Sequence, residues 1–153
     1  MRTPSVQGKV AVVTGGTRGI GREIARALVA ERGSVIICGR DRRRAEEVAA
    51  QLSRTGPGKC SGTACDVRRY AEVEALMRHA AETFGGLDIL VNNAGVAGRG
   101  AVADLPLEKW HEVIDTNLTG VFYCCRAAIP WMRQRGGGYI FNISSLAGIN
   151  PIP

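Results

Sequence analysis

The sequence predicts a single α/β domain built on a doubly wound parallel sheet, with helices on both faces in a three-layer α/β/α arrangement. Short apolar runs alternate with amphipathic helix patterns along all 153 residues, which is the order expected of βαβ units. The first apolar run ends at a glycine-rich turn that leads directly into a helix pattern. No repeat or low-complexity linker interrupts this order, so we expect one domain over residues 1–153.

The first half of the chain contains two strand–helix units and a weaker third strand. Residues 9–14 (KVAVVT) and 35–38 (VIIC) are apolar and rich in β-branched side chains, as in strands buried on both faces. Between them a helix is expected from Ile20 to a stop at Gly33, and a second helix follows Asp41, which is suited to cap it. Residues 62–65 form the weaker strand, which ends at Asp66.

The second half continues the alternation. A third helix over residues 73–84 ends at Gly85 and Gly86, a fourth strand covers residues 89–91, and a fifth covers residues 140–143. Residues 107–133 follow a helix pattern whose only interruption is Pro130. If this pattern is one continuous α-helix, the side chains expected to face the core are Trp110, Val113, Ile114, Leu118, Val121 and Phe122.

The chain carries a net charge of +6, and its densest basic run is Arg40, Arg42, Arg43 and Arg44. A run of this kind fits three explanations: a solvated helix start, an acidic small molecule or nucleic acid. Aromatic residues make up only 5% of the chain and no recognition motif is present. We therefore expect no nucleic-acid partner.

Cysteine and hydropathy patterns bear on the compartment and the metal content. The cysteines number five, and residues 1–9 are polar without the apolar segment of a secretory signal, so we expect no disulfide framework and a cytoplasmic protein. No apolar run of about 18 residues occurs, so no membrane association is expected. Cys60 and Cys65 have the wrong spacing for a zinc site, and His79 and His111 fit partly exposed helix positions. We therefore predict no metal site.

The turn after the first strand contains three spaced glycines, Gly15, Gly19 and Gly21, within the segment TGGTRGIG at 14–21. Gly15 permits a tight turn, Gly19 lets the backbone approach a phosphate, and Gly21 lets the helix pack close to the sheet. The free N–H groups at the helix start then face the anion. The spacing GxxxGxG differs from the common GxGxxG fingerprint and from a P-loop. A plain tight turn is the alternative interpretation of this segment alone.

Further segments accompany this turn in order along the chain: CDV at 65–67, NNAG at 92–95, DTNLTG at 115–120 and NISSLAG at 142–148. With these five motifs the chain resembles the short-chain dehydrogenase/reductase family over nearly its whole length. The resemblance implies a Rossmann-type sheet and an oxidoreductase that uses NAD(P). Such an enzyme moves a hydride between the nicotinamide and a carbonyl or alcohol group of a small-molecule substrate, for example a 3-oxoacyl compound or a related ketone.

The resemblance also implies roles for individual residues. Ser145 matches the catalytic serine that polarises the substrate carbonyl; we prefer it to Ser144 because the family pattern is Ser-x-x-Gly and Gly148 lies three positions after Ser145. Asn117 matches the helix asparagine that holds a water in the proton relay. A cap is the alternative role for Asp66. The expected cofactor contacts are Gly15, Thr17, Arg18, Gly19, Ile20 and Gly21 at the turn, Asp66 and Val67 near the adenine, and Asn92, Ala94 and Gly95 beside the ribose.

The end of the second strand favours NADP over NAD. An acidic residue about twenty positions after the glycine turn normally binds the ribose 2′-hydroxyl, but Gly39 occupies that position here. Arg40 follows at once and Arg18 projects from the turn, so two guanidinium groups can reach a 2′-phosphate. Asp41 comes one residue late and is better explained as an N-cap. We therefore expect NADP as the cofactor, with Arg40 among its contacts.

The acid–base pair of the family is a tyrosine followed four residues later by a lysine. None of Tyr70, Tyr123 and Tyr139 has a lysine at that distance, and in the family the pair lies further along the chain than Pro153. We therefore expect the chain to be the N-terminal part of a reductase, with its sheet truncated after the fifth strand and without activity by itself. A short, non-catalytic nucleotide-binding module is the alternative.

The resemblance further suggests a homo-oligomer, either a tetramer or a dimer. The apolar residues of the expected helix 107–133 cover more than one face of it. Tyr123, Ala127 and Trp131 do not follow the residue spacing of the face that is expected to pack on the core. A helix that is apolar on two sides must bury both of them. Pairing with the same helix of a second copy does so.

Overall fold

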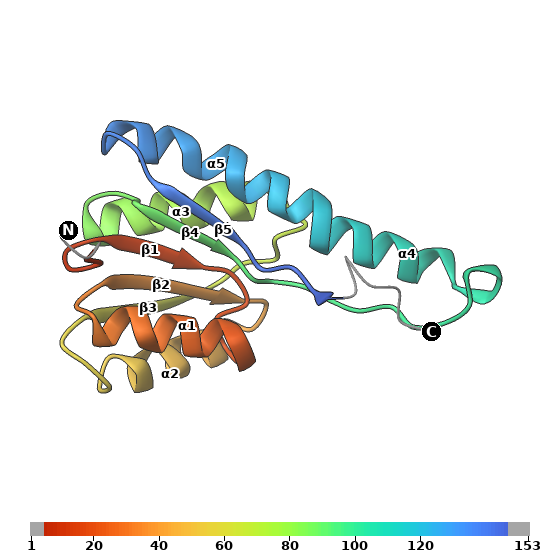
Figure 1. Cartoon of the computed structure of the whole chain (residues 1–153), viewed down its shortest axis with the longest axis horizontal. Helices are drawn as coiled ribbons and strands as arrows, with labels where there is room; N and C mark the ends of the chain where they lie inside the picture. The colour runs from red at the N-terminus through yellow and green to blue at the C-terminus, as the bar shows by residue number, and fades with distance from the viewer. Residues whose placement is uncertain (1–4, 147–153) are drawn as a thin grey trace.

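A computed structural model describes residues 5–146 of the chain. Five parallel strands form one sheet in the order β3-β2-β1-β4-β5 (Figure 1). The strands are β1 (Val10–Val13), β2 (Ser34–Gly39), β3 (Lys59–Ala64), β4 (Ile89–Asn92) and β5 (Tyr139–Asn142). The helices are α1 (Gly19–Ala30), α2 (Arg42–Leu52), α3 (Tyr70–Phe84), α4 (Leu107–Ile114) and α5 (Gly120–Gln134), with the single turns η1 (Val102–Asp104) and η2 (Asp115–Thr119). The predicted Rossmann-type doubly wound fold is confirmed.

The sheet is sandwiched between two helix layers, with α1 and α2 on one face and α3 and α5 on the other (Figure 1). Alternation along β1 sends Val10 and Val12 into the core beneath α3 and α5, whereas Ala11 and Val13 enter the core beneath α1 and α2. A strand that is buried on both faces needs apolar residues at every position, which explains the unbroken run VAVV.

Local signals mark most of the boundaries that the sequence predicts. The Asp41 carboxylate accepts a bond of 3.0 Å from the backbone N–H of Arg44, so Asp41 is the N-cap of α2. Gly85 ends α3 in the left-handed conformation, with φ +84°. β3 is longer than predicted at its amino-terminal end, where it begins at Lys59 rather than at Gly62. It pairs with β2 from Ser34↔Lys59 to Gly39↔Ala64. Its edge position lets the polar residues 59–61 join the strand.

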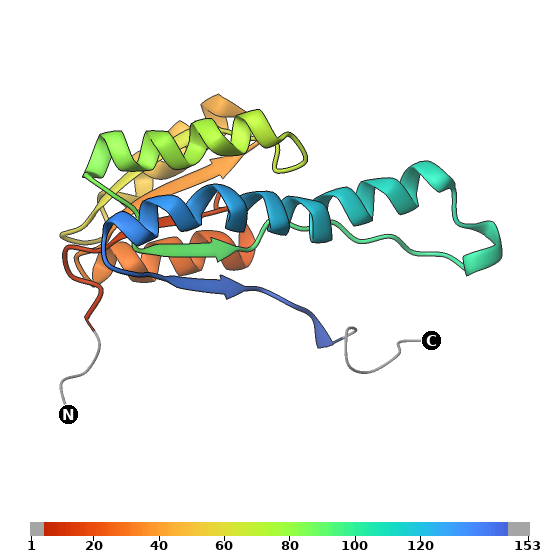
Figure 2. The same cartoon turned by 90° about the horizontal axis from the view of Figure 1, so that it is seen from above.

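The long helix pattern at 107–133 contains a π turn that the sequence did not predict. η2 joins α4 to α5, and within it the N–H of Gly120 bonds to the carbonyl of Asp115, five residues earlier. Figure 2 shows that α4 projects past the ends of the strands, away from the sheet. α5 alone lies over the sheet and contributes to the core.

The structure corrects the predicted inward face of residues 107–133 in two ways. Trp110, Leu118 and Phe122 were expected to face inward but are 53%, 64% and 58% exposed. α4 has no sheet beneath it, and a π turn takes an extra residue, so it rotates the inward face of α5. Ala127 and Trp131, expected off the core face, pack against the core instead. The buried positions of this region are Thr116, Gly120, Cys124, Ala127, Ala128 and Met132.

β5 is an edge strand, and all four of its residues are exposed. Within residues 5–146 no strand pairs with its outer edge. Tyr139 and Phe141 line an apolar cavity of about 900 Å³ that also reaches Ile24 and Leu28 of α1. None of the helices between residues 5 and 146 combines the length and the apolar character that crossing a membrane requires.

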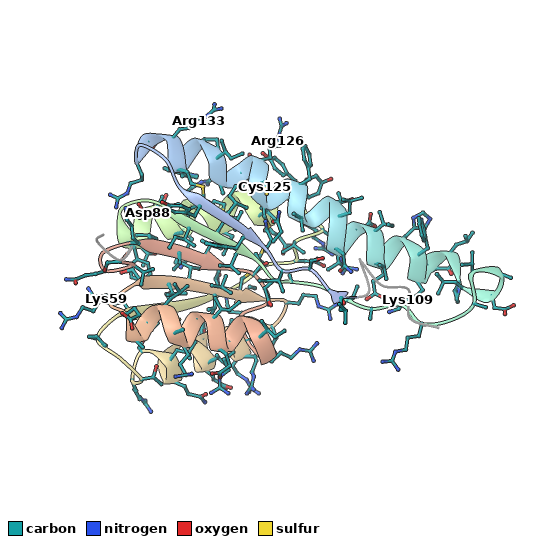
Figure 3. All side chains as sticks on the ribbon, in the orientation of Figure 1. Lys59, Asp88, Lys109, Cys125, Arg126 and Arg133 are labelled. Atoms are coloured by element: carbon teal, nitrogen blue, oxygen red, sulfur yellow. The ribbon has the colours of Figure 1, made fainter. Side chains whose placement is uncertain are left out.

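Asp88 fixes the amino-terminal end of the sheet (Figure 3). Its buried carboxylate accepts a bond of 2.9 Å from the N–H of Val10, at the start of β1. Lys9 and Arg135 reach it at 3.4 and 3.3 Å. Burial opposes ionisation, but the Val10 N–H and the two cations outweigh it and hold the pKa of Asp88 below the ordinary value. One carboxylate thus joins β1, β4 and the end of α5.

We expect Asp88→Asn to lower the free energy of unfolding by about 1–2 kcal/mol, because the amide keeps the Val10 bond but no longer balances two partly exposed cations. Denaturant titration measures this, with the exposed Asp104→Asn as control. A lowered native pKa means that the carboxylate stabilises the fold above the ordinary aspartate pKa and loses this effect as the pH falls. The difference from wild type should therefore shrink in acid, and a pH-independent difference would contradict the assignment.

Candidate functional site

A cavity of about 490 Å³ opens where the carboxyl ends of β1 and β4 diverge, which is the switch point of the doubly wound sheet. Five segments far apart in the sequence meet there: the glycine turn, the end of β2, the segment after β3, the segment after β4 and, at Thr116, η2. The predicted contacts that line it are Gly15, Thr17, Arg18, Gly19, Ile20, Arg40, Asp66, Val67, Ala94 and Gly95. Asn92, Gly21, Asn117 and Ser145 are not among its lining residues.

The glycine turn has the backbone shape that its sequence suggested. Gly15 and Gly19 take positive φ of +63° and +53°, which favours glycine over any residue with a Cβ. At Gly21 a Cβ would collide with the Asn93 amide and the Gly15 carbonyl, so this glycine allows close packing rather than direct lining. α1 begins at Gly19 without a side-chain cap, and its first N–H groups lie at the cavity. Uncapped N–H groups of this kind suit an anion.

Thr14 and Asn93 hold the two sides of the cavity together, and neither was predicted from the sequence as a site residue. The Thr14 hydroxyl accepts bonds from the N–H groups of Asn93 and Ala94 at 3.1 and 3.0 Å. It can donate to the Val91 carbonyl at 3.3 Å. The Asn93 amide donates to the carbonyls of Thr14 and Gly15 at 3.0 and 3.2 Å. These bonds fix the glycine turn against the end of β4.

Asn92 lies on the other side of β4 from the cavity. Its buried amide donates to Asn142 Oδ1 at 2.8 Å and to Cys125 Sγ at 3.4 Å, so it joins β4 to β5 and α5. The structure thus brings Asn93, rather than Asn92, to the cavity. Strand alternation was the signal for this, because Asn92 shares a face with Leu90, which packs beneath α3 and α5.

Arg18 and Arg40 both line the cavity and are exposed. Neither guanidinium forms an ion pair in the part of the chain that the structure describes. A Cβ at Gly39 would lie 3.0 Å from the Cγ2 atom of Thr17, so a side chain at this position requires a small shift of Thr17. The two cations can therefore take a phosphate without first losing a partner.

The other arginines of the basic run belong to the start of α2. Arg42 and Arg43 face Glu46 and Glu47 one turn later at 3.9 and 3.6 Å, and all four side chains are largely exposed. Pairs of this kind are typical of a solvated helix surface.

Asp66 and Arg68 form a tight ion pair at the cavity. Nη2 of Arg68 lies 2.6 Å from Oδ2 of Asp66, and Nε and the backbone N–H of Arg68 both reach Oδ1. The hydrogen bond from the Arg68 side chain outweighs the opposing effect of burial and holds the pKa of Asp66 below its ordinary value. Asp66 is therefore ionised at neutral pH. This self-contained pair also fits the alternative role of Asp66 as a local cap.

The two predicted catalytic residues lie outside the lining of this cavity. Asn117 sits in η2, where its side chain accepts from the N–H of Val96 at 2.9 Å and donates to the Val96 carbonyl at 2.8 Å. It thereby holds the segment after β4 against the π turn. Ser145 follows β5 and is exposed. Gly148, on which the choice of Ser145 over Ser144 depends, is outside the described residues.

Cys65 lines the cavity, and its hydrogen bond with Cys38 raises the pKa of its thiol. Between residues 5 and 146, no cluster of three or more histidine, cysteine, aspartate or glutamate side chains could hold a metal ion. The five cysteines are free. Burial raises the pKa of Cys60 and of Cys124 to about 12, so both thiols are protonated at neutral pH.

Comparison with known proteins agrees with this geometry. Residues 9–153 match the family model for short chain dehydrogenases. The chain is 41% identical over 145 residues to D-beta-hydroxybutyrate dehydrogenase of Cupriavidus necator, which covers 94% of this chain and 55% of the relative. It is 40% identical over 146 residues to 3beta-hydroxysteroid dehydrogenase of Mediterraneibacter gnavus, covering 95% of this chain and 52% of the relative.

A solved structure gives the same result. A crystal structure from Sinorhizobium meliloti 1021, described as a short-chain alcohol dehydrogenase, superimposes with a TM-score of 0.91 at 38% identity. The match covers 97% of this chain and 59% of that one, so the chain spans just over half the length of the proteins it matches. The family model, the sequence relatives and the fold agree, and the chain belongs to the short-chain dehydrogenase family of oxidoreductases.

Proposed function

We propose that the protein is an NADP(H)-dependent oxidoreductase that interconverts a ketone and a secondary alcohol on a small molecule. The observation that carries this proposal is the cavity at the sheet switch point, with two left-handed glycines, an uncapped helix start and two arginines that have no carboxylate partner among the described residues. The nicotinamide, when bound, supplies the hydride. The names of the relatives support a hydroxy acid, a 3-oxoacyl compound or a related ketone as the substrate class.

The preference for NADP over NAD rests on charge. A 2′-phosphate is a dianion, and Arg40 and Arg18 would face it from the end of β2 and from the glycine turn. Gly39 occupies the position of the acidic side chain that would bind a ribose hydroxyl. The cofactor-binding roles of the turn, of Asp66 and Val67, and of Ala94 and Gly95 belong to the same proposal.

For the chemical step we propose Ser145 as the donor that polarises the carbonyl oxygen and Asn117 as the residue that orders a water in the proton relay. A second candidate function is a nucleotide-binding module without catalysis, in which the glycine turn and the cavity bind the nucleotide and no turnover follows. Oxidation of NADPH in the presence of ketones by the full-length gene product tests the two: turnover supports the reductase, and binding without turnover supports the module. The five free thiols fit the reducing cytoplasm, which we propose as the compartment.

Arg40→Asp should reverse the nucleotide preference, with a loss of at least about tenfold in NADP affinity, because a carboxylate repels the 2′-phosphate and can accept from a ribose hydroxyl. Calorimetric titration with NADP and with NAD measures both constants without requiring turnover. Arg43→Asp is the matched control, since it changes the net charge equally and does not line the cavity. If Arg40→Asp still prefers NADP, Arg40 does not bind the 2′-phosphate, and Arg18 is then the one remaining candidate of the two for that contact.

Ser145→Ala should lower turnover about 10²–10³-fold, the usual cost of one donor to a developing oxyanion, and leave the dissociation constant for NADP nearly unchanged. The measurement is kcat, together with nucleotide binding, in whichever form of the protein turns over substrate. Ser144→Ala is the neighbouring control and should cost far less. Equal losses in the two variants would mean that the register of the motif is wrong.

We also propose a homo-oligomer, a dimer or a tetramer, that buries the outer face of the α4–α5 helix. The exposed apolar side chains on it are Trp110, Leu118, Phe122 and Ile129. Sedimentation velocity at micromolar concentration should show a species larger than one chain. Phe122→Glu should shift it toward the monomer, because a charge on this face must be desolvated on association. A wild-type protein that sediments as a monomer would overturn the proposal.

A further inference from the structure

The ion pair between Asp66 and Arg68 is built into the wall of the cavity rather than onto the protein surface. The side chains are only 15% and 34% exposed, and both line the cavity. The backbone of Asp66 is also anchored, because its N–H donates to Glu72 Oε2 of α3 at 2.8 Å. The negative charges of Glu112 in α4 and Asp115 in η2 also favour the charged form of the Arg68 guanidinium. The backbone of Asp66 is therefore anchored to α3, and its carboxylate is anchored to Arg68.

The hydrogen bonds of this pair leave the carboxylate partly unused. An ionised carboxylate offers about four acceptor sites on its two oxygens. Arg68 supplies three N–H groups: the backbone N–H at 3.1 Å and Nε at 2.9 Å to Oδ1, and Nη2 at 2.6 Å to Oδ2. Nε also lies 3.1 Å from Oδ2, so its single N–H is shared between the two oxygens. About one acceptor site remains, and it is on Oδ2, because no residue other than Arg68 donates to that oxygen within residues 5–146.

The chemistry of that remaining site is selective. A carboxylate held ionised only accepts, so it favours a ligand group that donates. The 6-amino group of adenine donates, whereas the 6-oxo group of hypoxanthine would bring two acceptors together. A free aspartate could turn away or take up a proton to accommodate the oxo group. An aspartate bonded through both oxygens to a fixed guanidinium can do neither cheaply.

We propose that Arg68 is a positioning residue that makes Asp66 a selective reader of the adenine 6-amino group, so that adenine dinucleotides are bound in preference to their hypoxanthine counterparts. The inference rests on the proposed binding of NADP at this cavity. It assigns Arg68 a role distinct from that of Arg18 and Arg40, because its guanidinium is already paired with Asp66, whereas theirs have no ion-pair partner among the described residues. Arg68 acts through Asp66 and not on the phosphate.

The test compares two ligands on the whole chain: NADP, and the analogue in which hypoxanthine replaces adenine. In the wild type, calorimetry should give at least about tenfold tighter binding of NADP. Arg68→Met keeps the apolar stem and removes the side-chain contacts with the carboxylate, so the ratio should fall below about threefold, mainly through weaker NADP binding. Arg68→Lys retains one charged donor and should give an intermediate ratio. Arg43→Met is the matched control, because Arg43 pairs with Glu47 outside the cavity and its loss should leave the ratio unchanged.

The outcomes separate the inference from the function on which it rests. If the wild type binds neither NADP nor NAD, the proposed function fails. If NADP binds but Arg68→Met keeps the wild-type ratio, Arg68 does not position Asp66. If Arg68→Met weakens both ligands equally and leaves NAD binding unaffected, Arg68 contacts the 2′-phosphate and the inference is overturned. Should Arg68→Met fail to fold, the ratio in Arg68→Lys decides: an unchanged ratio contradicts the proposal and a reduced one supports it.

Discussion

One threonine hydroxyl, that of Thr14, joins the two strands whose diverging ends create the cavity. It accepts from two consecutive N–H groups after β4 and sits at the last residue before the glycine turn of β1. Adjacent parallel strands separate once their ladder ends, so some other bond must hold their carboxyl ends in register. The glycine turn, the segment at 94–96 and Asn117, which binds Val96, are linked to one another through these bonds.

The two ends of the sheet differ in how their cations are paired. At the amino end, the buried Asp88 binds both Lys9 and Arg135, and the result is a structural clamp. At the carboxyl end, Arg18 and Arg40 have no ion-pair partner among the described residues, whereas Arg68 is bonded to Asp66. Cations with an ion-pair partner therefore occur at both ends, and those without one line the cavity at the carboxyl end.

Patterns with a local cause were predictable from the sequence, and those that depend on tertiary geometry were not. The strand β1, the cap at Asp41 and the glycine turn each follow from a few neighbouring residues. Phe122 was predicted wrongly because a period of 3.6 residues assumes an unbroken α-helix and the π turn changes the phase, and Trp110 because α4 projects past the sheet. Thr14 and Asn93 were not predicted as site residues because the hydrogen bonds between them join segments about 80 residues apart in the chain. The pairing of Asp66 with Arg68 is local, but two charges at this spacing need not meet unless the backbone turns between them.

The outer edge of β5, with which no strand pairs within residues 5–146, bears on how this chain behaves in concentrated solution. Its outer row of peptide groups and its aromatic side chains form a template to which another extended segment can add. The net charge of +6 opposes such self-association through mutual repulsion. That repulsion acts over a Debye length of about 10 Å at about 0.1 M salt and shorter still in more salt. Colloidal stability of this chain should therefore decline as ionic strength rises, with low salt as the protective condition.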